Sequence, residues 1–236
     1  MSETQMLKAL RHPNILQFLG FIADNDVYGI VTEFMDRGSL YQNLKDIRYK
    51  VKEEFSMEVK DKILLDICKG MSYLHNRKPK VLHRDLKSLN VLLTCDMRAK
   101  LADMGLSRIF EPFERRNRAM SLVGTPHWTA PEVLNREEYN EKADVWSFGI
   151  IVWEMVTYSK PYDGKPKNEV VVIVKRLQHL EMPAGAAPLY KRMMTMCWKE
   201  DPTERPTFDQ LRDLFERSSV DLDLFDPNLN SGMQDG

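Results

Sequence analysis

Residues 83–90 read His-Arg-Asp-Leu-Lys-Ser-Leu-Asn and lie between two short apolar runs, Val81–Leu82 and Val91–Leu93. The apolar runs are typical of short strands, so the polar residues between them are expected to form a loop. A loop that brings a carboxylate, an ammonium group and an amide together is costly unless these groups have ligands. The stretch therefore predicts a functional site in this loop.

A second acidic segment, Asp103-Met104-Gly105, follows the loop. The amide oxygen of Asn90 and the carboxylate of Asp103 are ligands suited to a hard cation such as Mg²⁺. The alternative is that these are ordinary loop residues, with Asp85 as a cap, Lys87 as a solvated charge and Asn90 in a turn. The shared spacing favours a joint role.

The two segments resemble the catalytic loop and the magnesium loop of the protein kinase family. Later segments resemble further elements of that family in the family's own order: Thr129–Glu132, Asp144–Gly149, Cys197-Trp198, and Asp201-Pro202 with Arg205-Pro206. The matches cover about residues 3–216, and several motifs in order are far more specific than one.

The resemblance implies a role for each residue of the site. Asp85 is expected to accept the proton of the substrate hydroxyl, and Lys87 to neutralise charge on the transferred phosphoryl group. Asn90 and Asp103 are expected to hold Mg²⁺. The implied substrates are ATP and a protein.

The stretch Thr32-Glu33-Phe34-Met35 resembles the family's hinge, where backbone groups meet the adenine of ATP. The resemblance places the Thr32 side chain at the back of the adenine pocket and Leu92 beneath the ring, with Glu33 and Met35 beside it. The alternative is an ordinary strand end.

The resemblance also implies contacts that support the loop. Thr125 is expected beside the loop's carboxylate and ammonium group, and Asp144 is expected to bind the loop's backbone. Glu132 and Arg205 are expected to form a buried ion pair. His83 is expected to be a satisfied core histidine that packs against the residue after Asp103.

Lys87 stands where Ser/Thr-directed kinases have lysine, and both Gly124–Trp128 and Cys197-Trp198 resemble the tyrosine-kinase-like group. We therefore expect phosphorylation of Ser and Thr. Ser121 matches the family's activation-loop site, so an upstream kinase is a possible partner, with Arg84 pairing the added phosphate. The alternative for this region is a plain exposed basic loop.

The family's glycine-rich loop and strand lysine find no match here, and Glu3 matches the helix glutamate that pairs with that lysine. The sequence therefore predicts a catalytic domain truncated in its N-terminal lobe. Three readings stay open: an active Ser/Thr kinase, a catalytically dead binding module, and an unstable fragment.

The expected fold is α+β, with a partial N-terminal lobe over residues 1–34, a mostly helical lobe over 35–217 and an acidic tail over 218–236. The first lobe would hold the end of a helix over residues 3–10 and a hairpin of Ile15–Ile22 with Tyr28–Phe34. Apolar residues at helical spacing from Val59 to Leu74 predict a helix, with Ser56 as its N-cap. Ser39 can cap a short helix through about Asn43, and the pattern from about residue 133 onward is also helical.

Among 236 residues, 43% are hydrophobic and the net charge is -1, which suits a soluble globular protein without a nucleic-acid-binding charge. No signal peptide or membrane span is expected, since the longest apolar stretch, Val145–Val156, is short and contains Glu154. The three cysteines have no metal-site spacing, so we expect small buried side chains in a reducing, cytoplasmic setting.

Overall fold

The computed structural model of the chain describes residues 10–24, 27–103, 108–109 and 125–223. Its elements, in chain order, are β1 (Phe18–Asp24), β2 (Val27–Thr32), α2 (Leu40–Arg48), α3 (Met57–His75), β3 (Val81–Leu82), η1 (Ser88–Asn90), β4 (Val91–Leu93), β5 (Ala99–Leu101), β6 (Arg108–Ile109), α4 (Pro131–Leu134), α5 (Lys142–Thr157), α6 (Lys167–Lys175), α7 (Pro188–Cys197), η3 (Pro202–Glu204) and α8 (Phe208–Asp223). Strands come early and helices dominate later, so the α+β class is confirmed.

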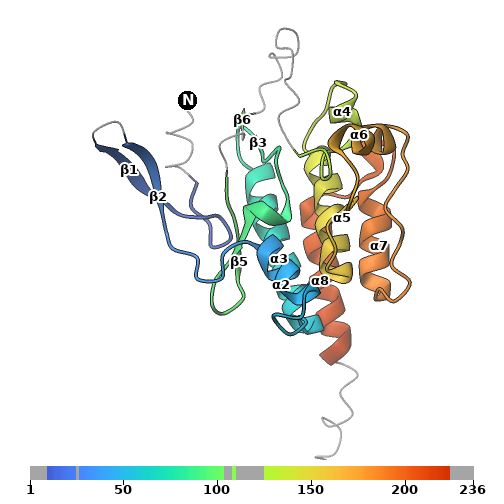
Figure 1. Cartoon of the computed structure of the whole chain (residues 1–236), viewed down its shortest axis with the longest axis horizontal. Helices are drawn as coiled ribbons and strands as arrows, with labels where there is room; N and C mark the ends of the chain where they lie inside the picture. The colour runs from blue at the N-terminus through green and yellow to red at the C-terminus, as the bar shows by residue number, and fades with distance from the viewer. Residues whose placement is uncertain (1–9, 25–26, 104–107, 110–124, 224–236) are drawn as a thin grey trace, which may run out of the picture.

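The β1–β2 hairpin stands to one side of a helical body (Figure 1). Its strands pair antiparallel, from Phe18 opposite Thr32 to Asp24 opposite Val27. The hairpin was predicted, but its first strand begins at Phe18. Ile15 instead forms an isolated parallel bridge with Leu101 and so belongs to the body. The helix end expected over residues 3–10 lies outside the described residues, apart from the buried Leu10.

The short strands around the polar loop form as predicted, but they do not pair with each other. β3 pairs antiparallel with β6, with Val81 opposite Ile109. β4 pairs antiparallel with β5, with Val91 opposite Leu101. The loop therefore connects two separate ladders.

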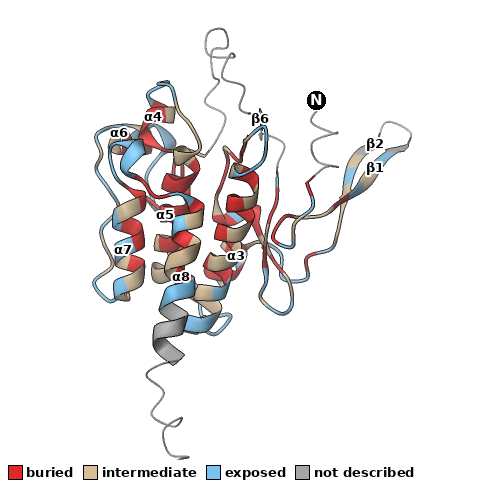
Figure 2. Ribbon diagram, turned by 180° about the vertical axis from the view of Figure 1, so that it is seen from behind, coloured by how far each residue is buried: buried red, intermediate tan, exposed pale blue. Residues whose placement is uncertain are grey.

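Helix α3 begins where the sequence predicts, because the Ser56 hydroxyl accepts a hydrogen bond from the Val59 amide at 3.3 Å. Its apolar face, including Ile63, Ile67 and Met71, is buried. The helix packs against α8, while α5 packs against α7. Figure 2 shows that the buried residues gather on the facing sides of these helices.

Helix α5 lies at the centre of the body and is apolar around most of its circumference, as its long hydrophobic run predicts. A side chain at Gly149 would place its Cβ 2.6 Å from Trp198 Nε1 and 2.8 Å from the Cys197 Cβ. Glycine is therefore what permits the close approach of α5 to the end of α7.

Three expectations from the sequence need correction, two on where a helix ends and one on the burial of a cysteine. The helix capped by Ser39 runs to Arg48, well beyond Asn43. α8 runs to Asp223, so residues 218–223 are helical although the sequence suggested a flexible tail from 218. Cys68 and Cys197 are buried as expected, but Cys95 is exposed because it lies in the turn between β4 and β5. Within the described residues, no helix has the length and apolarity needed to cross a membrane.

Candidate active site

The polar loop that follows β3 is held by one buried carboxylate from the first turn of α5. Asp144 accepts hydrogen bonds from the backbone amides of His83 and Arg84, each at 2.9 Å, and its Oδ2 lies 2.9 Å from His75 Nε2. Arg84 has φ 68°, in the left-handed region, so the loop needs this support. Burial raises the pKa of Asp144, but the hydrogen bond and charge of His75 and the His83 amide outweigh burial and lower it. The expected role of Asp144 is confirmed.

One carboxylate oxygen of Asp85 accepts hydrogen bonds from two other side chains of the loop. Lys87 Nζ donates to Asp85 Oδ2 at 2.5 Å and to the Thr125 hydroxyl at 3.3 Å. The turn of η1 brings Asn90 back, so that its amide nitrogen donates to the Asp85 backbone oxygen at 2.9 Å and to Oδ2 at 3.0 Å. Asp85 itself is 9% exposed. The structure thus brings Asp85, Lys87, Asn90 and Thr125 together.

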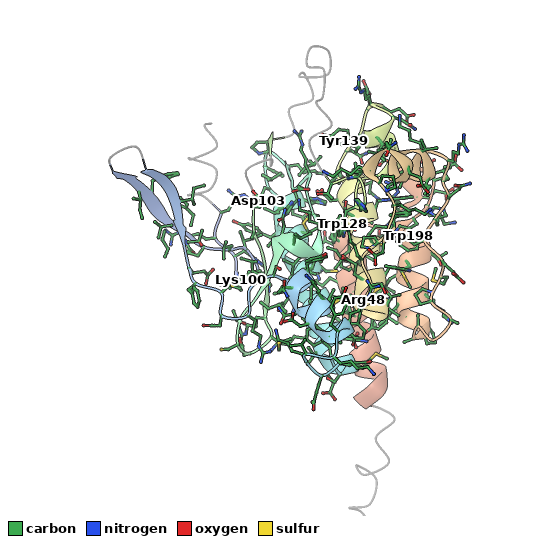
Figure 3. The ribbon with its side chains drawn as sticks, viewed as in Figure 1. Arg48, Lys100, Asp103, Trp128, Tyr139 and Trp198 are labelled. Carbon is green, nitrogen blue, oxygen red and sulfur yellow. The ribbon has the colours of Figure 1, made fainter. Side chains whose placement is uncertain are left out.

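The β4–β5 hairpin sets Asn90 and Asp103 at the same end of one ladder. Val91 and Leu101 are partners, and the Ala102 amide donates to the Asn90 backbone oxygen at 2.8 Å. Asp103 comes next, with φ 55° and an exposed position (Figure 3). The amide nitrogen of Asn90 makes both hydrogen bonds to Asp85, and no described residue donates to its side-chain oxygen.

This donor set fits Mg²⁺, which takes oxygen ligands and is often held by one or two protein side chains together with phosphate oxygens and water. Among the described residues no cluster of three or more His, Cys, Asp or Glu side chains could hold a metal ion by itself.

His83 is buried, but it is not the satisfied histidine that the sequence suggested. Within the described part of the chain, neither of its ring nitrogens has a hydrogen-bond partner. Burial lowers the pKa of His83, and the charges of Asp144, Asp85 and Asp103 oppose that shift only in part. The ring is therefore neutral at pH 7. Its expected neighbour Met104 lies outside the described residues.

The segment after β2 runs beside β4 at residues 37–39, a few residues beyond the expected hinge. The Leu93 amide donates to the Gly38 oxygen at 2.9 Å, and Leu92 forms an isolated bridge with Ser39. Met35 is buried.

The side chains of two of the expected hinge residues have protein partners. The Glu33 carboxylate accepts hydrogen bonds from Lys100 Nζ at 2.7 and 2.8 Å and from the Gln17 backbone amide at 2.7 Å. This carboxylate is therefore already paired within the protein. Thr32 is half-buried, and its hydroxyl donates to the Glu33 backbone oxygen at 3.1 Å. The Glu33–Lys100 pair was not foreseen, although Lys100 stands opposite Leu92 in the β4–β5 register.

The buried ion pair expected between Glu132 and Arg205 is present, with two bonds of 2.6 and 3.0 Å. Arg84, expected to pair with a phosphate on Ser121, has its guanidinium carbon 5.8 Å from the centre of the Tyr139 ring. Ser121 itself lies outside the described residues.

The sequence reasoning missed Glu154, a second buried carboxylate that supports the loop. Its Oε1 accepts from the Ser88 hydroxyl at 2.7 Å, and its Oε2 accepts from Trp128 Nε1 at 2.8 Å. Burial raises the pKa of Glu154 to about 8, and the hydrogen bonds from Trp128 and Ser88 oppose this only in part. A lone glutamate within the apolar run of α5 was the available signal.

The comparisons with known proteins agree with this geometry. The sequence model of the protein tyrosine and serine/threonine kinase family matches residues 1–215 of the chain. The chain belongs to the protein kinase family. The kinase resemblance inferred from the motifs is thereby confirmed.

Several curated kinases are similar to this chain. It is 44% identical to the probable serine/threonine-protein kinase drkC of Dictyostelium discoideum, over 89% of this chain and 28% of the relative. It is 39% identical to the serine/threonine-protein kinase CTR1 of Arabidopsis thaliana, over 90% of this chain and 26% of the relative. It is 37% identical to the serine/threonine/tyrosine-protein kinase HT1 of the same plant, over 92% of this chain and 54% of the relative. The chain thus spans about a quarter to a half of these kinases.

Proposed function

We propose that this chain carries the phosphotransfer site of a serine/threonine protein kinase, which moves the γ-phosphate of ATP to a hydroxyl of a protein. The observation that carries this proposal is the sharing of Asp85 Oδ2 by Lys87 and Asn90, at the end of the ladder that bears Asp103. The printed names of the most similar kinases support Ser and Thr as acceptors.

In this proposal each side chain has one task. Asp85 orients the acceptor hydroxyl and takes its proton, since its second carboxylate oxygen has no donor among the described residues. Lys87 lies beside it and stabilises negative charge that develops on the phosphoryl oxygens. Thr125 limits the positions open to the lysine ammonium group. Asn90 and Asp103 would hold Mg²⁺, which neutralises phosphate charge when bound.

We place the adenine of ATP against Thr32, Glu33, Met35 and Leu92. Because the Glu33 carboxylate is engaged by Lys100, its contribution would come from backbone groups. Met35 and Leu92 would supply apolar contact with the ring, as small-molecule sites usually do. We further propose that an upstream kinase acts on Ser121. The free cysteines Cys68, Cys95 and Cys197 suit a reducing, cytoplasmic setting.

Transfer of radiolabelled phosphate from ATP tests the proposal directly. The full chain is given Mg²⁺ and a peptide mixture with Ser, Thr or Tyr acceptors, beside the variant Asp85→Asn. Loss of the general base should lower transfer by about 10²-fold or more, and the label should appear on Ser and Thr. Equal transfer by both proteins would remove the catalytic assignment, and label on Tyr alone would remove the acceptor class.

A matched control separates the chemistry from folding. Lys175→Gln changes an exposed side chain at the end of α6 and should leave transfer unchanged. Thermal unfolding of Asp85→Asn should show the same single transition as the parent chain. No transfer by either protein, with ATP and Mg²⁺ still raising the unfolding temperature, would favour a nucleotide-binding module instead.

A further inference from the structure

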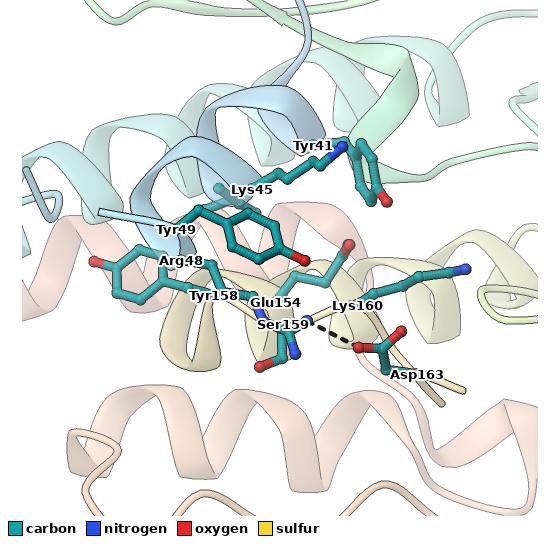
Figure 4. Close-up of a pocket in the computed structure, with 10 residues that line it drawn as sticks. Tyr41, Lys45, Arg48, Tyr49, Glu154, Tyr158, Ser159, Lys160 and Asp163 are labelled. Atoms are coloured by element: carbon teal, nitrogen blue, oxygen red, sulfur yellow. Dashed lines mark hydrogen bonds and ion pairs between the residues drawn. The ribbon is translucent and has the colours of Figure 1, made fainter. Parts of the chain in front are cut away.

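A surface pocket lies between α2, the C-terminal end of α5 and the loop that follows α5 (Figure 4). Its charged lining comes from Lys45 and Arg48 in the last turn of α2, Lys160 and Asp163 in the loop, and Glu154 of α5. Tyrosine side chains, among them Tyr49, supply the rest of a mixed polar and aromatic wall. Apart from Glu154, which supports the polar loop, none of these residues has a place in the proposed phosphotransfer site.

Positive charge dominates the solvent-facing part of this pocket. Lys45, Arg48 and Lys160 bring three cations, and Asp163 brings the one carboxylate that is exposed. Arg48 Nη1 lies 3.0 Å from Asp163 Oδ2, but the side chains are 38% and 50% exposed, so water weakens this pair. No described residue forms an ion pair with Lys45 or Lys160. The pocket therefore holds cations that an incoming anion would reach without breaking a strong contact.

Glu154 does not offset that positive charge. It is 1% exposed, and each of its carboxylate oxygens already accepts a hydrogen bond, one from Ser88 and one from Trp128. Burial raises its pKa to about 8, so the side chain is mostly neutral at pH 7. An anion in the pocket would meet the cations without repulsion from this residue.

The same glutamate joins the pocket to the candidate active site. Ser88, which donates to Glu154, begins the short η1 helix that carries Asn90. Trp128, which also donates to Glu154, makes a backbone hydrogen bond of 3.0 Å to Thr125, the residue that contacts Lys87. Through Glu154 the wall of the pocket is therefore connected to the loop that bears Asp85.

We propose that the pocket binds an acidic side chain of the substrate peptide, and that Lys45 and Arg48 select substrates with Asp or Glu near the phosphorylated residue. The proposal rests on the proposed kinase function for its biological meaning. The occupant follows from charge complementarity and from the continuity of the pocket wall with the catalytic loop.

Peptide binding measured by fluorescence anisotropy tests the proposal without requiring phosphate transfer. Paired fluorescent peptides carry Ser as acceptor and either Glu or Gln, scanned through positions on both sides of the Ser. At one or more positions the Glu peptide should bind the parent chain more tightly than its Gln partner. The double variant Lys45→Gln/Arg48→Gln should weaken the preferred Glu peptide by roughly tenfold, as expected for two exposed charge pairs, and leave the Gln peptide unchanged.

Two further variants control for net charge. Lys175→Gln/Arg192→Gln removes the same charge from exposed sites on α6 and α7 and should leave both peptides unaffected. Asp163→Asn removes the competing carboxylate and should tighten the Glu peptide. Equal affinity of each Glu and Gln pair for the parent chain would overturn the proposal, and so would an equal loss in both double variants.

This outcome is independent of the phosphotransfer test. If Asp85→Asn and the parent chain transfer equally little phosphate but the Glu preference and its loss are seen, the pocket stands and the catalytic assignment falls. If transfer depends on Asp85 but the peptides bind equally, the pocket proposal falls alone.

Discussion

Two buried carboxylates on α5 differ in protonation because they face different donors. Asp144 is 2% exposed and Glu154 is 1% exposed, so burial penalises the charged form of both. His75 and backbone amides surround Asp144 and lower its pKa in spite of burial. Only a hydroxyl and an indole N–H face Glu154, and its pKa rises to about 8. Asp144 thus holds the loop as a charged carboxylate, whereas Glu154 holds it as a neutral acid.

Glu154 predicts a pH dependence of stability with a definite sign. Its pKa rises from 4.5 in an unfolded chain to about 8 in the folded one, so the folded state binds more protons between these values. The free energy of unfolding should therefore fall as pH rises through this window. Glu154→Gln should flatten that fall in urea titrations at several pH values. An unchanged slope in the variant would contradict the assignment, and Glu169→Gln is an exposed control.

The buried Glu132–Arg205 ion pair predicts that removing a single partner lowers the free energy of unfolding strongly. Glu132→Gln leaves a guanidinium that is 0% exposed without its counter-ion and should cost about 3–5 kcal/mol of unfolding free energy. Adding Arg205→Met should cost less than the sum of the single changes. Glu169→Gln, which breaks an exposed pair with Lys165, should cost about 0.5 kcal/mol or less in the same urea titrations. Additive costs would show that the buried pair is not coupled.

At the scale of elements, the packing of one helix against another can depend on a single residue as well as on the periodic pattern of apolar residues. Helix α5 leaves no room at Gly149, where a new Cβ would lie 2.6 Å from Trp198 Nε1. Gly149→Ala should therefore destabilise the fold by about 1–3 kcal/mol, although alanine favours helix. Gly185→Ala is the matched control because its Cβ would meet nothing within 4 Å. Thermal unfolding of both variants checks this, and a stabilised Gly149→Ala would mean that α7 shifts freely.

The sequence predicted those elements whose signal is local. The spacing of apolar residues and the Ser56 cap are enough to locate α3, and a continuous apolar run locates α5. The pairing of β3 with β6 joins strands far apart along the chain and had no local signal, whereas the β4–β5 hairpin was missed because residues 99–101 were not recognised as a strand. The extension of α8 to Asp223 was missed because acidic and serine-rich sequence is also typical of tails.

The same distinction applies to the candidate site. Asp85, Lys87 and Asn90 were foreseen because their contacts span five residues or fewer, within one motif. Longer contacts were foreseen only where the family resemblance implied them, as for Asp144 and for the Glu132–Arg205 pair, whose partners are 60 and 73 residues apart. Glu154 was not among those implied contacts, and its partners Ser88 and Trp128 are 66 and 26 residues away along the chain. The pairing of Lys100 with Glu33 was likewise not predicted, since the two residues are 67 apart along the chain and no motif includes Lys100.

At the scale of the whole molecule, stability is distributed unevenly. The β1 and β2 strands contact mainly each other, and they expose Leu19 and Ile30 at 61% and 62%. Helix α5 lies inside the body instead, with most of its side chains buried. Hydrogen exchange should show rapid local opening of the hairpin amides, while α5 amides exchange only through global unfolding. Equal protection of the two elements would contradict this distribution.

The position of α5 has a consequence for how activity responds to distant mutations. Asp144 and Glu154 are ten residues apart on this helix, or about 15 Å, and each restrains a different part of the polar loop of residues 83–90. A core substitution that slides or rotates the helix displaces both restraints together and moves Asp85 with them. Libraries of folded variants should therefore yield altered rates of the proposed phosphotransfer most often from changes buried along α5.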